Sequence, residues 1–390
     1  MSFNMYVPTR IIFGNGRLDE LHQQEMPGKK ALVVISDGKS VHESGALERC
    51  QQQLDMAGIQ TVVYSKINAN PTKNTVMEGA RRARENTCDF IVALGGGSVM
   101  DAGKAIAIMA TNPGDLWDYV SGGSGKAQPL QQDPLPVVCI TTTAGTGSEV
   151  DQWGVVTNEE TNEKIGCGGY DSLFPTLALV DPELMRSVPP KFTAYQGFDT
   201  LFHATESYIS SYANMMSDMY ALTAIENVGK YLARAVKNGN DMEAREHMAF
   251  ANTLSGVVMT VSVTTAEHSM EHAMSAYHPA LPHGAGLILI SKAFYEFFIE
   301  NHACDERFIR MARALGMKDA SRPEDFITAL VKLQQQCGVD GLKMSDYGFT
   351  RDEFETLAKN ARETMGGLFL ANPSEMTQED CVKIFEKSFQ

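Results

Sequence analysis

The chain has 390 residues, 43% of them hydrophobic, and a single core stops growing at roughly 250–300 residues, so two domains are expected. Its formal net charge of −15 argues against nucleic acid or an anionic membrane as a partner, and neither a signal peptide nor an apolar run of about 20 residues is present. The seven cysteines show no C-x-x-C pair and no framework spacing, which predicts reduced thiols and a cytoplasmic location.

Short apolar runs alternate with helix-periodic segments in the first half of the chain. This alternation is typical of a parallel sheet with helices on its faces. We therefore predict a Rossmann-like α/β domain over residues 1–188. The expected strands lie at 10–14, 29–37, 60–65, 89–95, 134–143 and 175–181, and the expected helices at 41–56, 72–86 and 98–111.

The character of the sequence changes after Pro190. Long segments with apolar residues at three- and four-residue spacing replace the strand-like runs. They lie at 191–211, 215–236, 242–262, 264–277 and 284–301. This pattern predicts an all-helical second domain over residues 189–390.

Two glycine- and hydroxyl-rich turns follow predicted strands. GGGS at 95–98 opens a helix, and glycines beside a helix N-terminus let backbone N–H groups approach a phosphate. Ser98 and Asp101 also form an S-x-x-D pattern, so a simple helix cap is the alternative. TTTAGTGSEV at 141–150 is the second turn, and an ordinary polar exit from a strand is its alternative.

Asp37 ends the predicted strand at 29–37. An acidic residue in this place can accept hydrogen bonds from the adenine ribose and repel a 2′-phosphate. The alternative is an N-cap for the helix that follows.

The second half carries a group of metal-ligating residue types. Asp199 and His203 are four residues apart, as are His268 and His272, and a helix places such pairs on one face. A carboxylate with two or three imidazoles suits Fe²⁺ or Zn²⁺. A lone histidine on an apolar helix face is usually a core residue. Four histidines within residues 268–283 are harder to explain in that way.

From end to end the chain resembles the iron-containing (group III) alcohol dehydrogenases. The resemblance is carried by FGNG at 13–16, NPT at 70–72, GGGSVMDAGKAIA at 95–107, TTTAGTGSEV at 141–150, GFDTLFHA at 197–204 and EHSMEHAMSAYHPALPHGAG at 267–286. It implies a dehydroquinate synthase-like architecture and an NAD(H)-dependent alcohol dehydrogenase or aldehyde reductase. The substrates of such an enzyme would be small to medium aliphatic alcohols or aldehydes, and the enzyme would be a homodimer or higher homo-oligomer.

The resemblance also implies roles for residues of the first half. Asp37 would favour NAD over NADP. Trp153 would face the substrate, with an ordinary core tryptophan as the alternative. The remaining nucleotide contacts would come from Asn70, Gly96, Gly97, Ser98, Thr142, Thr143, Thr146 and Lys164.

In the second half the resemblance implies four metal ligands: Asp199, His203, His268 and His283. His272 would lie beside the metal and the nicotinamide as a catalytic proton relay without binding the metal. In many relatives the two histidines that match His272 and His283 are ten positions apart, whereas His272 and His283 are eleven apart. His278 lies between them and is therefore an alternative ligand.

Other functions have to be weighed against this one. A glycerol dehydrogenase-like polyol oxidoreductase would share the fold. A dehydroquinate synthase-like lyase would need basic residues to hold an acidic substrate, and the metal motif has no arginine or lysine nearby. A metal-binding protein without catalytic activity is the remaining alternative.

Overall fold

The computed structural model describes residues 3–389. The chain divides into two compact units. One comprises Val7–Val188, and the other comprises Pro189–Gln390 together with Met1–Tyr6, within the described residues.

A six-stranded parallel sheet forms the centre of the first unit. Its strand order is β1-β8-β5-β4-β2-β3. The strands are β1 (Arg10–Phe13), β2 (Lys30–Ser36), β3 (Gln60–Ile67), β4 (Phe90–Gly95), β5 (Val137–Thr141) and β8 (Leu177–Val180). The central strands are buried along their length because helices cover both faces, as is usual for parallel sheets.

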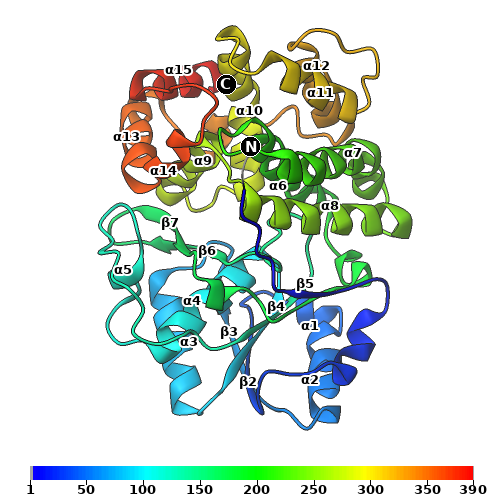
Figure 1. Ribbon diagram of the computed structural model, residues 1–390, viewed down its shortest axis with the longest axis vertical. Coiled ribbons are helices and arrows are strands. Elements are labelled where there is room, and N and C mark those ends of the chain that lie inside the picture. The colour runs from blue at the N-terminus through cyan, green and yellow to red at the C-terminus, as the bar shows by residue number, and fades with distance from the viewer. Residues whose placement is uncertain (1–2, 390) are drawn as a thin grey trace. The chain divides into compact units, whose positions relative to one another are not determined.

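Helices α3 and α4 lie on one face of this sheet, and α1 and α2 lie on the other (Figure 1). The α/β unit contains α1 (Ser40–Glu43), α2 (Ala46–Met56), α3 (Lys73–Glu85), α4 (Gly97–Thr111) and α5 (Leu116–Tyr119). The single helix expected at 41–56 is divided by Gly45, whose φ of 72° lies in the left-handed region.

The order of the strands creates a switch point between β2 and β4. The chain moves outward from β2 to β3 and then returns to the other side of β2 to form β4. Ligands of open α/β sheets bind at the carboxyl ends of the strands at such a point. Asp37 follows β2 there and Gly96 follows β4. Because Gly95 is in register with Thr141 of β5, the loop after β5 reaches the same edge.

A small antiparallel hairpin, which the sequence did not predict, accompanies the main sheet. It consists of β6 (Trp153–Asn158) and β7 (Glu163–Gly168). Thr157 N donates to Pro71 O over 2.8 Å, so the hairpin is tied to the loop before α3.

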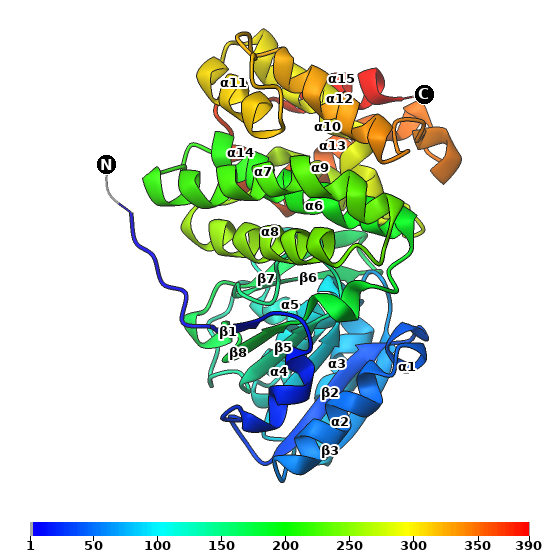
Figure 2. The same cartoon turned by 90° about the vertical axis from the view of Figure 1, so that its right-hand side faces the viewer.

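The second unit is helical. Figure 2 shows α6, α7 and α8 packed side by side within it. The five predicted helices are present, and within residues 302–389 there are five more. They are α6 (Pro190–Ile209), α7 (Met215–Lys237), α8 (Met242–Val261), α9 (Ala266–Tyr277), α10 (His283–Glu300), α11 (Asp305–Ala314), α12 (Asp325–Gln336), α13 (Phe354–Thr364), α14 (Gly366–Leu370) and α15 (Gln378–Ser388). The predicted fold class, a parallel α/β half followed by an all-helical half, is confirmed.

No helix within residues 3–389 is by itself both long and apolar enough to cross a bilayer. Only the pair α8 and α9, bent by 108° where they meet, passes on length and composition together.

Candidate metal and nucleotide sites

A carboxylate and three imidazoles converge inside the helical unit. Asp199 and His203 lie one turn apart on α6, His268 lies on α9, and His283 is the first residue of α10. Asp199 Oδ1 is 3.6 Å from His268 Nε2, 3.4 Å from His283 Nε2 and 3.7 Å from His203 Nδ1. Among the described residues, two groups have donor atoms within 4.8 Å of one another: Asp199, His268 and His283, and, sharing His283, Glu271, His272 and His283. His203 stacks its ring on that of His268, with centroids 4.4 Å apart.

Glycines allow α10 to bring its histidine to this centre. A Cβ atom on Gly284 would lie 2.2 Å from Tyr195 O of α6, and one on Gly286 would lie 2.7 Å from Glu271 Cγ of α9. Any larger residue at either position would push the helices apart. The glycines of the PHGAG motif therefore permit the close helix packing on which the site depends.

A buried glutamate supports each of two histidines from behind. His268 Nδ1 is hydrogen-bonded to Glu206 Oε1, and His283 Nδ1 to Glu271 Oε2. Because an ionised carboxylate only accepts, each ring carries a proton on Nδ1, and Nε2 is the atom that it turns toward Asp199. The sequence interpretation missed both glutamates. Their signal was helical spacing, since Glu206 lies two turns after Asp199 and Glu271 three residues after His268.

The donor set fits a divalent cation. Among the described residues, neither Asp199 Oδ1 nor His268 Nε2 has a hydrogen-bond partner, although both atoms are buried. Burial raises the pKa of Asp199, but His203 and His283 outweigh it and hold that pKa well below its usual range. Burial lowers the pKa of His268, but Glu206 and Asp199 outweigh it and raise that pKa to about 10. The centre thus favours a positive charge between its carboxylates, which a divalent cation supplies.

His272 and His278 occupy different surroundings. His272 is buried one turn after His268, and its Nδ1 lies 2.9 Å from Met365 Sδ. His278 follows α9, lies 3.0 Å from Glu353 Oε1 through Nε2, and packs its ring on Phe349. The structure therefore places His283 in the converging group and His278 against a separate element.

In the α/β unit, the loop after β5, residues 142–147, packs directly on the start of α4, and we call it the threonine loop. A Cβ atom on Gly96 would lie 3.0 Å from the Thr143 side chain, and one on Gly97 would lie 2.2 Å from the Thr146 side chain. Glycines at these two positions permit this approach. The first backbone N–H groups of α4 have no acceptor within the helix and are available to a ligand. Thr142 N donates to Gly95 O over 3.0 Å and joins the loop to β4.

Ser98 does not cap its helix. The N-cap of α4 is Gly96, and the Ser98 hydroxyl donates to Ala69 O, beside Asn70. The S-x-x-D pattern is thus no capping box here, because Asp101 is bonded to residues outside the helix. Lys164 lies buried in β7 rather than in a solvated loop.

Asp37 is exposed at the carboxyl end of β2. Its Oδ2 accepts a hydrogen bond of 3.0 Å from Asn68 Nδ2. The N-cap of α1 is Lys39, so Asp37 is not a helix cap. Its carboxylate is open to a ligand at the switch point.

Trp153 is not a core residue. It begins β6 and is 44% exposed. Its ring rests on Gly169, where a Cβ atom would lie 2.6 Å from the indole. Gly168 and Gly169 have φ values of 119° and 82°, so this shelf requires glycine.

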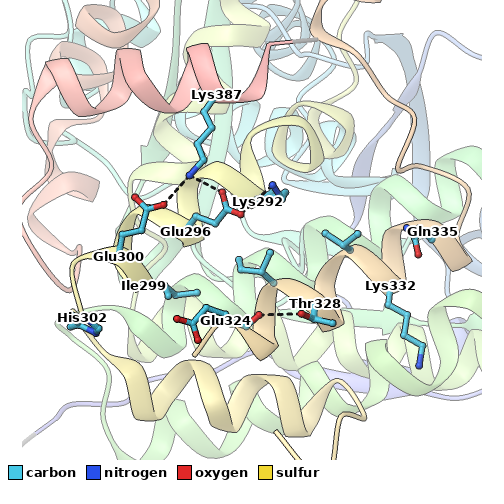
Figure 3. A pocket seen from close by; sticks show the side chains of 12 residues that line it. Lys292, Glu296, Ile299, Glu300, His302, Glu324, Thr328, Lys332, Gln335 and Lys387 are labelled. Carbon is cyan, nitrogen blue, oxygen red and sulfur yellow. Dashed lines mark hydrogen bonds and ion pairs between the residues drawn. The ribbon is translucent and has the colours of Figure 1, made fainter. Parts of the chain in front are cut away.

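A hollow of about 920 Å³ in the helical unit lies among α10, α12 and α15 (Figure 3). Lys387 Nζ in it is 2.9 Å from Glu296 and 3.0 Å from Glu300. None of its lining residues belongs to the predicted sites. Glu296 also pairs with Lys292, over 3.1 Å.

The first unit has a helix N-terminus at the switch point of its sheet, and the second has a buried group of a carboxylate and imidazoles. These two features are typical of metal-dependent oxidoreductases. The model of the family described as iron-containing alcohol dehydrogenase matches residues 8–182, and that of the Fe-containing alcohol dehydrogenase family, C-terminal, matches residues 193–389. The chain therefore belongs to the iron-containing alcohol dehydrogenase family, as its sequence motifs indicated.

Relatives of known function match along the whole chain. The 1,3-propanediol dehydrogenase of Klebsiella pneumoniae is 32% identical, with 100% of both chains covered. The NAD-dependent methanol dehydrogenase of Bacillus methanolicus is 31% identical, with 99% of both covered. Among solved structures, an archaeal halo-thermophilic alcohol dehydrogenase from a Red Sea brine pool is 36% identical and has a TM-score of 0.94. The match covers 100% of this chain and 99% of that one.

Proposed function

We propose that the protein is an NAD(H)-dependent alcohol dehydrogenase or aldehyde reductase for small to medium aliphatic substrates. In this proposal residues 1–188 bind the dinucleotide, and residues 189–390 bind the metal and the substrate. The observation that carries it is the buried convergence of Asp199, His268 and His283, whose two imidazoles are each held by a carboxylate. The methanol and propanediol dehydrogenases among its relatives support the same reaction.

When bound, a divalent metal, Fe²⁺ first and Zn²⁺ as the alternative, supplies Lewis-acid polarisation of a substrate oxygen, and NAD supplies the hydride acceptor. Asp199, His203, His268 and His283 hold the cation. Glu206 and Glu271 fix the two imidazoles behind it in the tautomer that binds metal.

His272 is the residue we assign to proton transfer. Because a thioether sulfur only accepts, the contact of Nδ1 with Met365 Sδ places the ring proton on Nδ1. Nε2 is then the atom that takes the proton of the alcohol, or returns it during aldehyde reduction.

The nucleotide is assigned to the switch point of the sheet. Gly96, Gly97 and Ser98 at the start of α4 would receive the pyrophosphate through backbone N–H groups. The exposed carboxylate of Asp37 would accept hydrogen bonds from the hydroxyls of the adenine ribose. The other contacts are assigned to Asn70, Thr142, Thr143, Thr146 and Lys164. A homo-oligomeric state and a cytoplasmic location remain predictions.

The test is metal-dependent NADH oxidation. Protein stripped by a chelator should lose aldehyde-dependent NADH oxidation and regain it when Fe²⁺ or Zn²⁺ is added anaerobically. Mg²⁺, which prefers oxygen ligands, is the control ion and should not restore activity. Full activity in the stripped protein would contradict the proposal.

A further inference from the structure

Lys104, on the buried face of α4, is fully enclosed and plays no part in the function proposed above. Its ammonium lies 2.8 Å from Ser148 Oγ, 2.8 Å from Asp151 Oδ1 and 2.6 Å from Trp153 O. An ammonium has three N–H donors. All three are therefore used to hold one stretch of chain, residues 148–153.

Asp101 lies one turn earlier on α4, and its carboxylate binds the same stretch of chain. Its Oδ1 accepts from Ser148 Oγ over 2.7 Å, and its Oδ2 accepts from Val155 N over 3.0 Å. A Cβ atom on Gly154 would lie 2.8 Å from Asp101 O, so the segment 148–155 runs against the helix backbone itself.

Both backbone polar atoms of Trp153 are bonded within this network. Its N–H donates to Asp151 Oδ1 over 2.7 Å, and its carbonyl accepts from Lys104. The exposed indole therefore projects from a backbone that cannot shift without breaking buried charged hydrogen bonds. The same segment is continuous with the threonine loop, whose Thr146 packs on Gly97 at the start of α4.

Such a network is a poor way to gain stability alone. Removing two aspartates and a lysine from water costs free energy, and apolar residues of similar volume would often stabilise the fold as well. What charged hydrogen bonds add is a defined geometry. Here these hydrogen bonds define the geometry of the segment between the threonine loop, which we assign to the nucleotide, and Trp153.

We propose that Lys104 is a positioning residue that locks residues 148–155 to α4 and thereby sets the places of both the threonine loop and Trp153. That these positions matter for nucleotide and substrate binding rests on the proposed function. The locking itself can be measured without turnover.

Trp153 provides a direct readout of the locking. The chain has two tryptophans, and Trp117→Phe leaves Trp153 as the only one. In that background we would introduce Ser148→Ala and, separately, the pair Lys104→Met with Asp151→Asn. The pair removes one positive and one negative charge, so that Asp151 does not remain as a buried carboxylate without Lys104 if Lys104→Met alone fails to fold.

The expected result is a looser Trp153 and weaker nucleotide binding. Acrylamide quenching of Trp153 should rise and its fluorescence anisotropy should fall in both variants. The dissociation constant for NADH, measured by calorimetry, should rise about tenfold for the pair and less for Ser148→Ala. Ser291→Ala is the matched control, because Ser291 is also a buried serine with two hydrogen bonds, but in the helical unit. It should lower the melting temperature without changing the quenching, the anisotropy or the NADH affinity.

Unchanged quenching, anisotropy and NADH affinity in both variants would overturn the proposal. So would changes of equal size in Ser291→Ala, because the effect would then be general loosening of the fold. If Trp153 is loosened but the parent protein shows no metal-dependent NADH oxidation, the locking stands and the proposed function fails.

Discussion

His268 and Glu206 form a buried pair in which the imidazole Nδ1 is bonded to the carboxylate while Nε2 faces Asp199. Glu206 also accepts from the backbone N–H and hydroxyl of Thr265, over 2.7 and 2.8 Å. The carboxylate is thus fixed by α6 and by the start of α9 at once. The direction of a ligand atom is set here by a residue that does not itself belong to the ligand set.

Glu206→Gln should weaken metal binding without abolishing it. The amide keeps the size of the side chain but can offer an N–H to His268, which favours the wrong tautomer. Loss of such a partner typically costs 10–100-fold in metal affinity. Competition with a chromogenic chelator measures this. Glu296→Gln, on α10 but in surface ion pairs, is the control, and equal losses in both variants would refute the role.

Single substitutions should separate ligands from neighbours at the centre. Asp199→Ala and His283→Ala should lose the metal, because each removes a converging donor. His272→Ala should retain the metal but turn over slowly, and His278→Ala should retain both metal and activity. Elemental analysis of the purified variants decides the matter. A full metal content in His283→Ala with a loss in His278→Ala would reverse the assignment.

Asp37 should set the preference for NAD over NADP. A carboxylate next to a 2′-phosphate costs several kcal/mol, so kcat/KM for NADH should exceed that for NADPH by about a hundredfold. Asp37→Gly should narrow the ratio. Asp37→Asn separates charge from shape and should narrow it similarly. Equal use of both cofactors by the unaltered protein would disprove the role.

Trp153 should select against polar substrates. A hydroxyl that is desolvated on its apolar ring without a partner costs roughly 1–3 kcal/mol, or about ten- to a hundredfold in kcat/KM. Butanal should therefore be a better substrate than glyceraldehyde, and Trp153→Asn should shift the ratio toward glyceraldehyde. The control is Trp117→Phe, which replaces the buried tryptophan of α5. A ratio that Trp153→Asn leaves unchanged would place the indole outside the pocket.

Stability should carry a pH signature of Asp101. Burial, partly offset by Lys104, Ser148 and the backbone of Val155, raises its pKa from 3.8 to about 6. Between these values the folded protein keeps a proton that the unfolded chain has lost. The Asp101 contribution to stability therefore falls as pH rises through this window.

Asp101→Asn cannot ionise, so its unfolding free energy relative to the unaltered protein should increase by up to about 3 kcal/mol between about pH 4 and 6, and level off above. Urea unfolding of both proteins across this range gives the difference, in which the titrations of Asp151 and other groups largely cancel. A difference independent of pH would mean that Asp101 ionises normally.

The main sheet was predictable because its strands are short apolar runs, whose burial needs no knowledge of partners. The β6–β7 hairpin was not, because its place depends on contacts distant in sequence. Gly154 lies against Asp101, and Thr157 is bonded to Pro71. The division between α1 and α2 depends on the left-handed backbone of Gly45. Neither feature leaves a periodic signal.

The candidate site shows the same division. Helical spacing alone paired Asp199 with His203 and His268 with His272. The choice between His278 and His283 could not be made in this way, because it depends on where the chain turns between α9 and α10. Glu206 and Glu271 were overlooked because a glutamate on a helix usually faces water. Helical spacing puts them on the same faces as Asp199 and His268, but their burial follows from the packing of three helices.

The burial of the proposed ligands has a consequence for how the protein acquires its metal. Asp199, His203 and His268 are at most 5% exposed and, with His283, come from three helices that pack against one another. The side chain of His283 is 23% exposed, so an ion could leave only on that side and would have to give up three buried ligands to do so. We therefore expect exchange between iron and zinc to be slow compared with synthesis of the protein. The ion found in a purified sample would then reflect the supply during folding rather than the intrinsic preference of the site.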